Sequence, residues 1–257
     1  GVEYRPVDRC GRVDRLDFPL RYADGMAELV EQHLADADGG TLMIQALCSY
    51  MLRPLVKALR DAAIPFHNPL RRARGDWNPL GDRKGTSTKD RLLAFLTDEQ
   101  TGTTASLWMP MLQAKGVLAR GAKEKIKDGV PDDPGEVMRL FESEDVAMAA
   151  FSGDAAWLLD HVTGEFRDRL AYPSQVARRR GVDALREEPR VMLGTIHSFK
   201  GGEADRVVVS PDLSPAAWAE HVDDLPSVRR AFYVAMTRTR DRLEILAPSS
   251  HRAVELT

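Results

Sequence analysis

The sequence predicts an α/β fold in which a mainly helical block interrupts a parallel sheet domain. Three observations support this prediction. Strand-like and helical patterns alternate over residues 1 to 72, which is typical of α/β folds. Helical patterns dominate residues 73 to 189. Apolar β-rich runs then return within residues 190 to 257, so the first and last segments are predicted to form one domain around a helical insertion.

The first segment is predicted to run as strand, helix, strand, helix. Residues 24 to 36 repeat apolar side chains on one helical face, and residues 41 to 47 form a short apolar run suited to a buried parallel strand. A second helix is predicted from about Ser49, an acceptable N-cap, and it ends before an extended piece at residues 64 to 66. This alternation favours a parallel sheet with helices packed on it.

The middle segment begins with turn residues and continues with four predicted helices. These helices cover residues 90 to 95, 106 to 115, 134 to 142 and 153 to 172. In the last one, apolar and aromatic side chains recur at steps of three and four residues, namely Trp157, Leu158, His161, Val162, Phe166 and Leu170. Strand-like runs resume at Val191 to Leu193 and at Val207 to Val209.

Composition limits the classes of protein that the chain can belong to. At 257 residues with 43% hydrophobic and 29% charged residues, it resembles an ordinary soluble globular protein. No apolar run approaches the ~20 residues needed to cross a bilayer, so we expect no membrane partner and a cytoplasmic location. Cys10 and Cys48 lack companions at metal-binding spacing, so we expect no metal bound by this chain.

The overall charge does not favour nucleic acid, because the net charge is −3 and the pI is near 6.1. Any contact with DNA must therefore come from local patches. Two basic clusters exist, Arg71, Arg72, Arg74, Arg83, Lys84, Lys89 and Arg91 in one, and Arg167, Arg169, Arg178, Arg179, Arg180, Arg186 and Arg190 in the other. Acidic residues are interleaved with both, and charge runs are commonly solvated faces, so the clusters are supporting observations only.

Two segments near the end of the chain carry the specific signal. Val191 to Asp205 reads Val-Met-Leu-Gly-Thr-Ile-His-Ser-Phe-Lys-Gly-Gly-Glu-Ala-Asp, a strand that leads into a polar, glycine-containing loop. Arg229 to Arg240 reads Arg-Arg-Ala-Phe-Tyr-Val-Ala-Met-Thr-Arg-Thr-Arg, a helical stripe that delivers arginines just before a strand-like run. An arginine therefore leaves the end of a helix beside a sheet.

These segments resemble motifs V and VI of the UvrD/Rep family of superfamily 1 DNA helicases. The family patterns are roughly Thr-x-His-x-x-Lys-Gly-x-Glu and Arg-Arg-x-x-Tyr-Val-x-x-Thr-Arg, and both match at nearly every defining position. The resemblance implies the C-terminal portion of such a helicase, with a RecA-like, P-loop NTPase-type domain 2A interrupted by a helical domain 2B. It covers residues 1 to 72 and 185 to 257 well. Over the insertion, only the position of the inserted segment in the chain agrees with the family.

The resemblance implies three contacts with ATP. Arg238 matches the motif VI arginine finger, whose planar charged fork suits phosphate oxygens. Glu203 matches the glutamate that accepts a hydrogen bond from the ribose. Lys200 and Gly201 lie in the loop near phosphate, and for Lys200 this phosphate belongs either to the nucleotide or to DNA. The alternatives are a surface glutamate at 203 and, at 238, a cation that favours the helix C-terminus or pairs with Asp241.

The same resemblance implies contacts with the backbone of single-stranded DNA. Thr195 and His197 match the family positions for these contacts, which fix register without reading sequence. Trp77, beside basic residues, is a candidate for stacking on bases, although packing inside the protein is the alternative. Tyr233 lies within motif VI and is expected to pack its helix against the sheet.

The chain departs from the family pattern at three places. The motif IV arginine is expected near Ala46 and Leu47, which are both apolar, and Arg53 is a possible substitute. Ser227 and Val228 replace an acidic pair that often precedes motif VI. Gly202 replaces a larger apolar residue, which predicts a looser loop.

No P-loop or Walker B strand is found in the sequence, because Gly81 to Lys89 lacks the Gly-Lys-Ser/Thr order. We therefore expect the cofactor ATP with Mg²⁺ to need an N-terminal motor domain of the same protein, which supplies the metal ligands. The predicted function is an ATP-dependent DNA helicase acting in replication, repair or recombination on single-stranded or partly duplex DNA. A non-catalytic scaffold that binds DNA or protein is the alternative, and a small-molecule enzyme lacks any supporting motif.

Overall fold

The computed structural model describes residues 11–81, 87–97, 102–223 and 225–256. The chain folds into two compact units. The sheet unit comprises residues 1–77 and 189–257, and the helical unit comprises residues 78–188. The assignment of these units to domains 2A and 2B stays a prediction.

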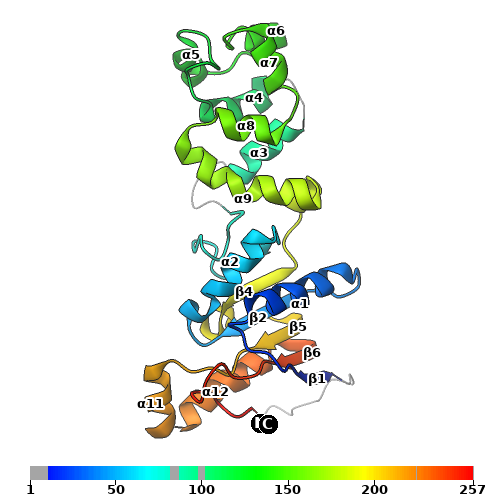
Figure 1. The fold of residues 1–257 in the computed structure, drawn as a ribbon, viewed down its shortest axis with the longest axis vertical. Helices are drawn as coiled ribbons and strands as arrows, with labels where there is room; N and C mark the ends of the chain where they lie inside the picture. Colours follow the sequence, from blue (N-terminus) through cyan, green and yellow to red (C-terminus); the bar gives the residue numbers. More distant parts are fainter. Residues whose placement is uncertain (1–10, 82–86, 98–101, 224, 257) are drawn as a thin grey trace, which may run out of the picture. The chain divides into compact units, whose positions relative to one another are not determined.

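The sheet unit is built on six parallel strands (Figure 1). They are β1 (Arg12–Arg15), β2 (Leu42–Ala46), β3 (Phe66–His67), β4 (Val191–Thr195), β5 (Ala204–Val209) and β6 (Thr239–Ile245). Their order across the sheet is β1-β6-β5-β2-β4-β3, and every pairing is parallel. The predicted α/β fold with a parallel sheet and an inserted helical segment is therefore confirmed. All strand starts lie at one edge, called here the amino-terminal edge, and all strand ends lie at the carboxyl-terminal edge.

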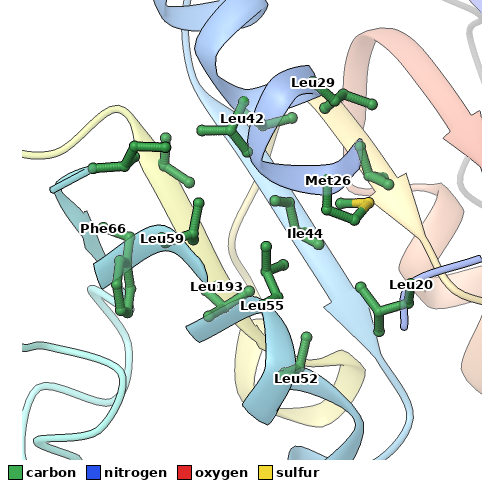
Figure 2. Close-up of a cluster of buried hydrophobic side chains, with 14 of the residues drawn as sticks. Leu20, Met26, Leu29, Leu42, Ile44, Leu52, Leu55, Leu59, Phe66 and Leu193 are labelled. Carbon is green, nitrogen blue, oxygen red and sulfur yellow. The ribbon is translucent and has the colours of Figure 1, made fainter. Parts of the chain in front are cut away.

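Helices cover the sheet on both faces, so β2 at its centre is buried along its whole length. On one face lie α1 (Ala23–Ala35) and α2 (Arg53–Asp61), the latter preceded by the 3-10 helix η1 (Ser49–Leu52). Figure 2 shows Met26, Leu55 and Leu59 of this face packed against strand residues such as Ile44 and Leu193. Each buried leucine or methionine contributes about 1.5–3 kcal/mol to folding.

The opposite face is covered by the 3-10 helix η3 (Ile196–Phe199) and α12 (Leu225–Met236). Alternate residues of β2 point this way, and Met43 joins Phe199 and Phe232 in a second buried cluster. α11 (Pro215–Asp223) precedes α12 and packs against it. The two predicted motif segments therefore lie together on this face.

The helical unit contains α3 (Thr88–Leu96), α4 (Gly102–Trp108), η2 (Met109–Met111), α5 (Ala122–Asp128), α6 (Pro134–Met138), α7 (Glu144–Ala150), α8 (Ala155–His161), α9 (Gly164–Arg180) and α10 (Asp183–Arg186). Its core is aromatic. Trp108 makes T-shaped contacts with Phe95 and Phe151, with ring centroids 5.1 and 5.6 Å apart. Ser87 begins α3 with a capping box, so the local sequence specifies this helix start.

The predicted single helix over residues 153 to 172 is wrong, because α8 ends at His161 and α9 begins at Gly164. Val162 between them is extended and forms a bridge with Leu112, which is incompatible with continuing the helix. The apolar spacing continues across the break, since both helices face the same core. The periodic spacing therefore predicted the buried face correctly, but it joined two short helices into one.

Within the described ranges, no helix is long and apolar enough to cross a membrane. The same residues contain no group of three or more His, Cys, Asp or Glu side chains that could hold a metal ion. Cys48 is a free thiol, and Cys10 lies outside the described residues.

Candidate functional site

Glu203 and Arg238 lie side by side at the amino-terminal edge of the sheet. The N–H of Ala204 donates to the carbonyl oxygen of Arg238 at 3.0 Å, and Ala204 pairs with Thr239 in the sheet register. The two predicted nucleotide-contact residues therefore precede adjacent parallel strands. Motif V ends at the start of β5, and motif VI ends at the start of β6. The pairing of these two strands therefore brings Glu203 and Arg238 together.

The side chain of Arg238 turns back onto the end of α12. Its Nε donates to the carbonyl oxygen of Val234 at 3.0 Å, and the side chain is half-buried. A cation at this position favours the negative end of the helix dipole, as the alternative interpretation expected. In the described part of the chain, the two terminal guanidinium nitrogens have no hydrogen-bond partner. They are available to a ligand while Nε stays anchored.

Glu203 is exposed and pairs with another motif VI arginine. Its Oε2 lies 3.3 Å from Nε of Arg240, and the two side chains are 54% and 52% exposed. Arg240 also lies 3.7 Å from Oδ1 of Asp205. Exposed pairs of this kind contribute only about 0–1 kcal/mol, so a competing hydroxyl donor can replace Arg240 at little cost.

The loop before Glu203 holds Lys200 and Gly201. Gly201 has φ of +87°, a conformation that disfavours any residue with a Cβ, and Lys200 is exposed. Gly202 donates its N–H to the carbonyl oxygen of Phe199 at 2.9 Å, and a Cβ added there would lie 3.2 Å from Cδ1 of Leu70. Leu70 therefore occupies part of the space that a larger residue at position 202 would fill.

Asp205 is a structural residue of this edge that sequence reasoning missed. Its Oδ2 accepts hydrogen bonds from the N–H of Thr41 at 2.7 Å and from the Thr41 hydroxyl at 2.8 Å. The Thr41 N–H is the main reason that the pKa of Asp205 lies below its usual value. Gly40 has φ of +62°, and a Cβ there would approach the Asp205 carboxylate more closely than Cβ atoms do. In the sequence, the two adjacent glycines before β2 were the signal for this close approach.

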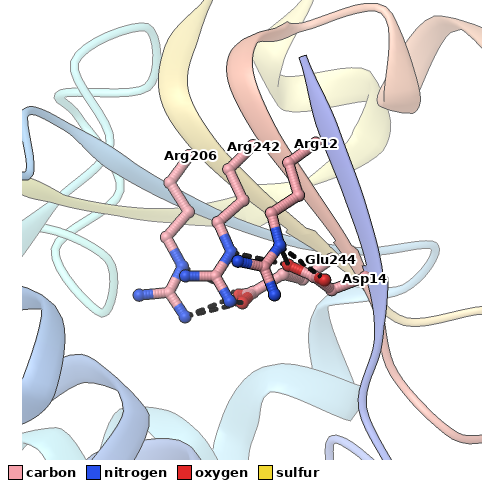
Figure 3. Close-up of polar contacts among 5 residues, drawn as sticks. All are labelled: Arg12, Asp14, Arg206, Arg242 and Glu244. Carbon is pink, nitrogen blue, oxygen red and sulfur yellow. Dashed lines mark hydrogen bonds and ion pairs between the residues drawn. The ribbon is translucent and has the colours of Figure 1, made fainter. Parts of the chain in front are cut away.

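A row of arginines crosses β5, β6 and β1 on the α1 side of the sheet (Figure 3). Arg206, Arg242 and Arg12 are in register, and Glu244 and Asp14 lie two residues further along their strands. Arg206 binds the fully buried Glu244 through two bonds of 2.8 Å, and Arg242 lies 2.9 Å from Asp14. These pairs offset the repulsion between the arginines. Arg206, Arg242 and Glu244 line part of a groove of about 840 Å³ beside α1. In β1 and in β6, an arginine is followed two residues later by an acidic residue, and this alternation of charge was visible in the sequence.

Thr195 and His197 lie at the opposite, carboxyl-terminal edge. Thr195 ends β4 and is half-buried, whereas His197 projects from η3 and is exposed. Arg53 begins α2 just after β2, and β2 ends beside Thr195, so Arg53 also belongs to this edge. The use of Arg53 in place of the missing motif IV arginine stays a prediction.

Two aromatic predictions disagree with the structure. Trp77 is 2% exposed within the core of the sheet unit, and the guanidinium of Arg74 covers its ring at 3.7 Å from the centroid. No ring face is free for a base, so the packing alternative applies. Tyr233 was expected to pack against the sheet but is 65% exposed, because it lies on the solvent side of α12, opposite the buried Phe232 and Ala235.

The basic clusters are partly used inside the protein. Arg190 donates to the carbonyl oxygens of Gly40 and Asp36 at 2.8 Å each. Arg167 donates to the carbonyl oxygens of Leu159 and Asp160 at the end of α8. Arg83 and Lys84 lie outside the described residues. The clusters therefore remain weak support for contact with nucleic acid.

Comparison with known families matches one segment of the chain. Residues 177–250 match the UvrD-like helicase C-terminal domain. The matched segment contains β4, β5, α12 and β6, so it holds both motif segments. Comparison with curated proteins gave no match. The predicted resemblance to UvrD-family helicases is confirmed for this segment, and the parallel α/β sheet is consistent with the RecA-like domain of that family. The match implies a helicase motor domain, with ATP use and DNA binding at the level of the family.

Proposed function

We propose that this chain supplies one wall of the ATP site and one DNA-contact surface of an ATP-dependent DNA helicase. Arg238 acts as the arginine finger, and Glu203 accepts a hydrogen bond from the ribose. Lys200 and Gly201 belong to the loop near phosphate, and Thr195 and His197 contact the backbone of single-stranded DNA. The observation that carries the proposal is the pairing of β5 with β6, which brings Glu203 and Arg238 to neighbouring strand starts.

The chemistry of the amino-terminal edge fits a nucleotide. Phosphoryl transfer develops negative charge on the transferring group, and a fixed guanidinium stabilises that charge. Nε of Arg238 is anchored on Val234, so its remaining donors are held in place by the helix end. The exposed carboxylate of Glu203 can exchange its weak pair with Arg240 for a ribose hydroxyl.

ATP with Mg²⁺ fits this donor set only in part. The edge offers cationic and hydrogen-bonding groups for the nucleotide, but the described residues contain no cluster of metal-ligating side chains. The Mg²⁺ ligands and the phosphate-binding loop are therefore assigned to an N-terminal motor domain of the same protein, which is the proposed partner. The bound ion would neutralise charge on the phosphates during hydrolysis.

The separation of the two edges suits a motor. Nucleotide contacts gather where the strands begin, and the proposed DNA contacts gather where β4 ends. β4 and β5 are joined through η3 and the loop that carries Lys200, so one continuous segment touches both ligands. Movement of this segment on ATP hydrolysis would shift the DNA contacts, which is the coupling that translocation requires.

The test is the DNA-stimulated ATPase activity of a polypeptide that joins this chain to its P-loop-bearing motor domain. Arg238→Ala should lower kcat by about 10³-fold or more, because a finger acts on the transition state. Arg120→Ala is the control, since Arg120 is an exposed arginine of the helical unit. Near-normal turnover in Arg238→Ala would refute the finger, and absence of DNA-stimulated turnover in the parent protein would favour the non-catalytic scaffold.

A further inference from the structure

A buried hydrogen-bond network packs against the proposed DNA-contact turn, and none of its side chains is among the residues predicted above to contact a ligand. Its centre is Asn68, which follows β3 and is completely buried. Nδ2 of Asn68 donates to the carbonyl oxygen of Leu193 at 3.0 Å and to the hydroxyl of Ser198 at 3.1 Å. Its Oδ1 accepts from the N–H of Leu70 at 3.2 Å. The amide thus uses both of its donor hydrogens and its acceptor.

The network continues from Asn68 to the turn itself. The Ser198 hydroxyl accepts from Asn68 and donates to the carbonyl oxygen of Thr195 at 2.7 Å. Ser198 is 5% exposed, so this bond lies away from solvent. Buried polar groups of this kind are costly to leave unpaired, which makes the arrangement specific as well as stable. The Thr195 carbonyl is therefore held by the buried Ser198 hydroxyl, which is itself held by the buried Asn68 amide.

The end of β3 explains why a side chain is needed here. β3 pairs with β4 only at Phe66 and His67, whose partners are Val191 and Met192. Asn68 is the next residue, and its side chain binds the carbonyl oxygen of Leu193, the next residue of β4. The Asn68 amide extends the sheet by one hydrogen bond after the strand has ended. It thereby ties the segment after β3 to the last part of β4.

Gly194 shows how closely the network is fitted. A Cβ built on Gly194 would lie under 3.0 Å from both Nδ2 of Asn68 and Oγ of Ser198. The glycine is therefore required by the space that the two polar side chains occupy, not by its backbone conformation. Three residues that are distant in sequence, Asn68, Gly194 and Ser198, form one fitted unit.

We propose that Asn68 and Ser198 are positioning residues that hold the β4–η3 turn in the geometry in which Thr195 and His197 meet single-stranded DNA. This inference rests on the proposed function, and it adds residues that act without touching the ligand. The hydroxyl of Ser198 fixes the Thr195 carbonyl, and Asn68 fixes Ser198. His197 lies between Thr195 and Ser198 in the sequence, and its side chain is exposed to solvent.

The first measurement is the affinity of the 257-residue chain for a fluorescein-labelled oligo(dT), followed by fluorescence anisotropy. Ser198→Ala should weaken binding about fivefold, a coupling of ordinary size for residues in one hydrogen-bond network. In a Thr195→Val/His197→Ala background, the same substitution should change affinity less than about twofold, because its effect passes through those two residues. An equal loss in both backgrounds, or no loss in the parent, would overturn the proposal.

A salt titration gives a readout that a general loss of structure would not share. Ser198 carries no charge, so the dependence of log Kd on log salt should keep its slope in Ser198→Ala. Lys200→Ala should reduce that slope by about 0.7 if Lys200 binds a DNA phosphate. Ser152→Ala is the matched control, because the Ser152 hydroxyl makes the same bond to the carbonyl three residues earlier, also at 2.7 Å, but is exposed in the helical unit.

Hydrogen exchange separates the positioning role from the DNA-contact proposal. In Ser198→Ala and Asn68→Ala, the amides of residues 195–200 should exchange faster, while those of β2 stay protected. If Thr195→Val/His197→Ala leaves DNA affinity unchanged, the proposed DNA contacts fail. Faster exchange in Ser198→Ala would still support the positioning of the turn, and unchanged exchange would refute it.

Discussion

The two edges of the parallel sheet are held by different kinds of interaction. At the amino-terminal edge, Glu203 and Arg240 form an exposed ion pair beside the solvent-facing loop. At the carboxyl-terminal edge, Thr195 is held by the buried, uncharged network of Asn68 and Ser198. Exposed pairs are weak and exchangeable, whereas buried hydrogen bonds fix geometry.

Under the proposed function, this difference would allow one motif segment to serve two ligands. A nucleotide must enter and leave in each cycle, so its contacts gain from side chains whose present partners are easily displaced. A translocating motor must meet each new DNA phosphate with the same geometry, so its contacts gain from a fixed turn. Three predictions examine this contrast.

The largest effect on stability is expected from Gly194→Ala at the carboxyl-terminal edge. The added Cβ must displace Asn68 and Ser198, which combines overpacking with broken buried hydrogen bonds, so the free energy of unfolding should fall by about 3 kcal/mol. Urea unfolding followed by circular dichroism measures it. Gly164→Ala is the control, because no atom lies within 4 Å of the Cβ position there. Equal stability of the two variants would mean that Asn68 and Ser198 can move at little cost, so that the buried network does not fix the geometry of the turn.

A smaller effect is expected from Asp205→Ala at the amino-terminal edge. The substitution removes two hydrogen bonds from Thr41 to a carboxylate, which should cost about 2 kcal/mol at pH 7. The pKa of Asp205 is lowered in the folded state, chiefly by the Thr41 N–H, so its contribution is present above the unfolded value of 3.8 and is lost as pH falls through the lower folded value.

The stability difference between the parent and Asp205→Ala should therefore shrink on acidification below about pH 4. Urea unfolding at a series of pH values measures this difference. Asp38→Ala, an exposed aspartate near the same edge, should show little effect at any pH. A difference between parent and Asp205→Ala that grows in acid would contradict the assigned cause.

The smallest effect is expected from Arg240→Ala. Its partners Glu203 and Asp205 lie at 3.3 and 3.7 Å, and the Arg240 side chain is 52% exposed, so the free energy of unfolding should change by less than about 0.5 kcal/mol. The same urea experiment at low and high salt checks this value. A loss above about 1 kcal/mol would show that this pair is structural and not readily exchanged.

The sequence predicted the sheet unit better than the helical unit. β2, α1 and α2 were expected close to where they occur, because a short apolar run and a repeating helical face are local signals. The helical unit has short helices joined by tight turns, so its periodic patterns continue across breaks. The break at Val162 depends on a bridge to Leu112, and no local pattern contains that information.

The predictions for the candidate site were likewise correct in some parts and wrong in others. The resemblance to helicase motifs V and VI pointed to Thr195, Glu203 and Arg238, and the family match covers those segments. Trp77 and Tyr233 were assigned incorrectly, because the exposure of an aromatic residue depends on which side of its element meets the core.

The parallel α/β class, the helical insertion and the two helicase-like segments could be predicted from the sequence, because strands, helices and motif spacings are encoded by neighbouring residues. Only the folded chain shows that Glu203 and Arg238 share an edge, that Thr195 lies at the other edge, and that the Asn68–Ser198 network supports it. Strand order and register are set by packing between distant segments, which local patterns do not contain. A hydrogen bond from Asn68 to Ser198 joins residues 130 positions apart, and no local pattern in the sequence specifies that pairing.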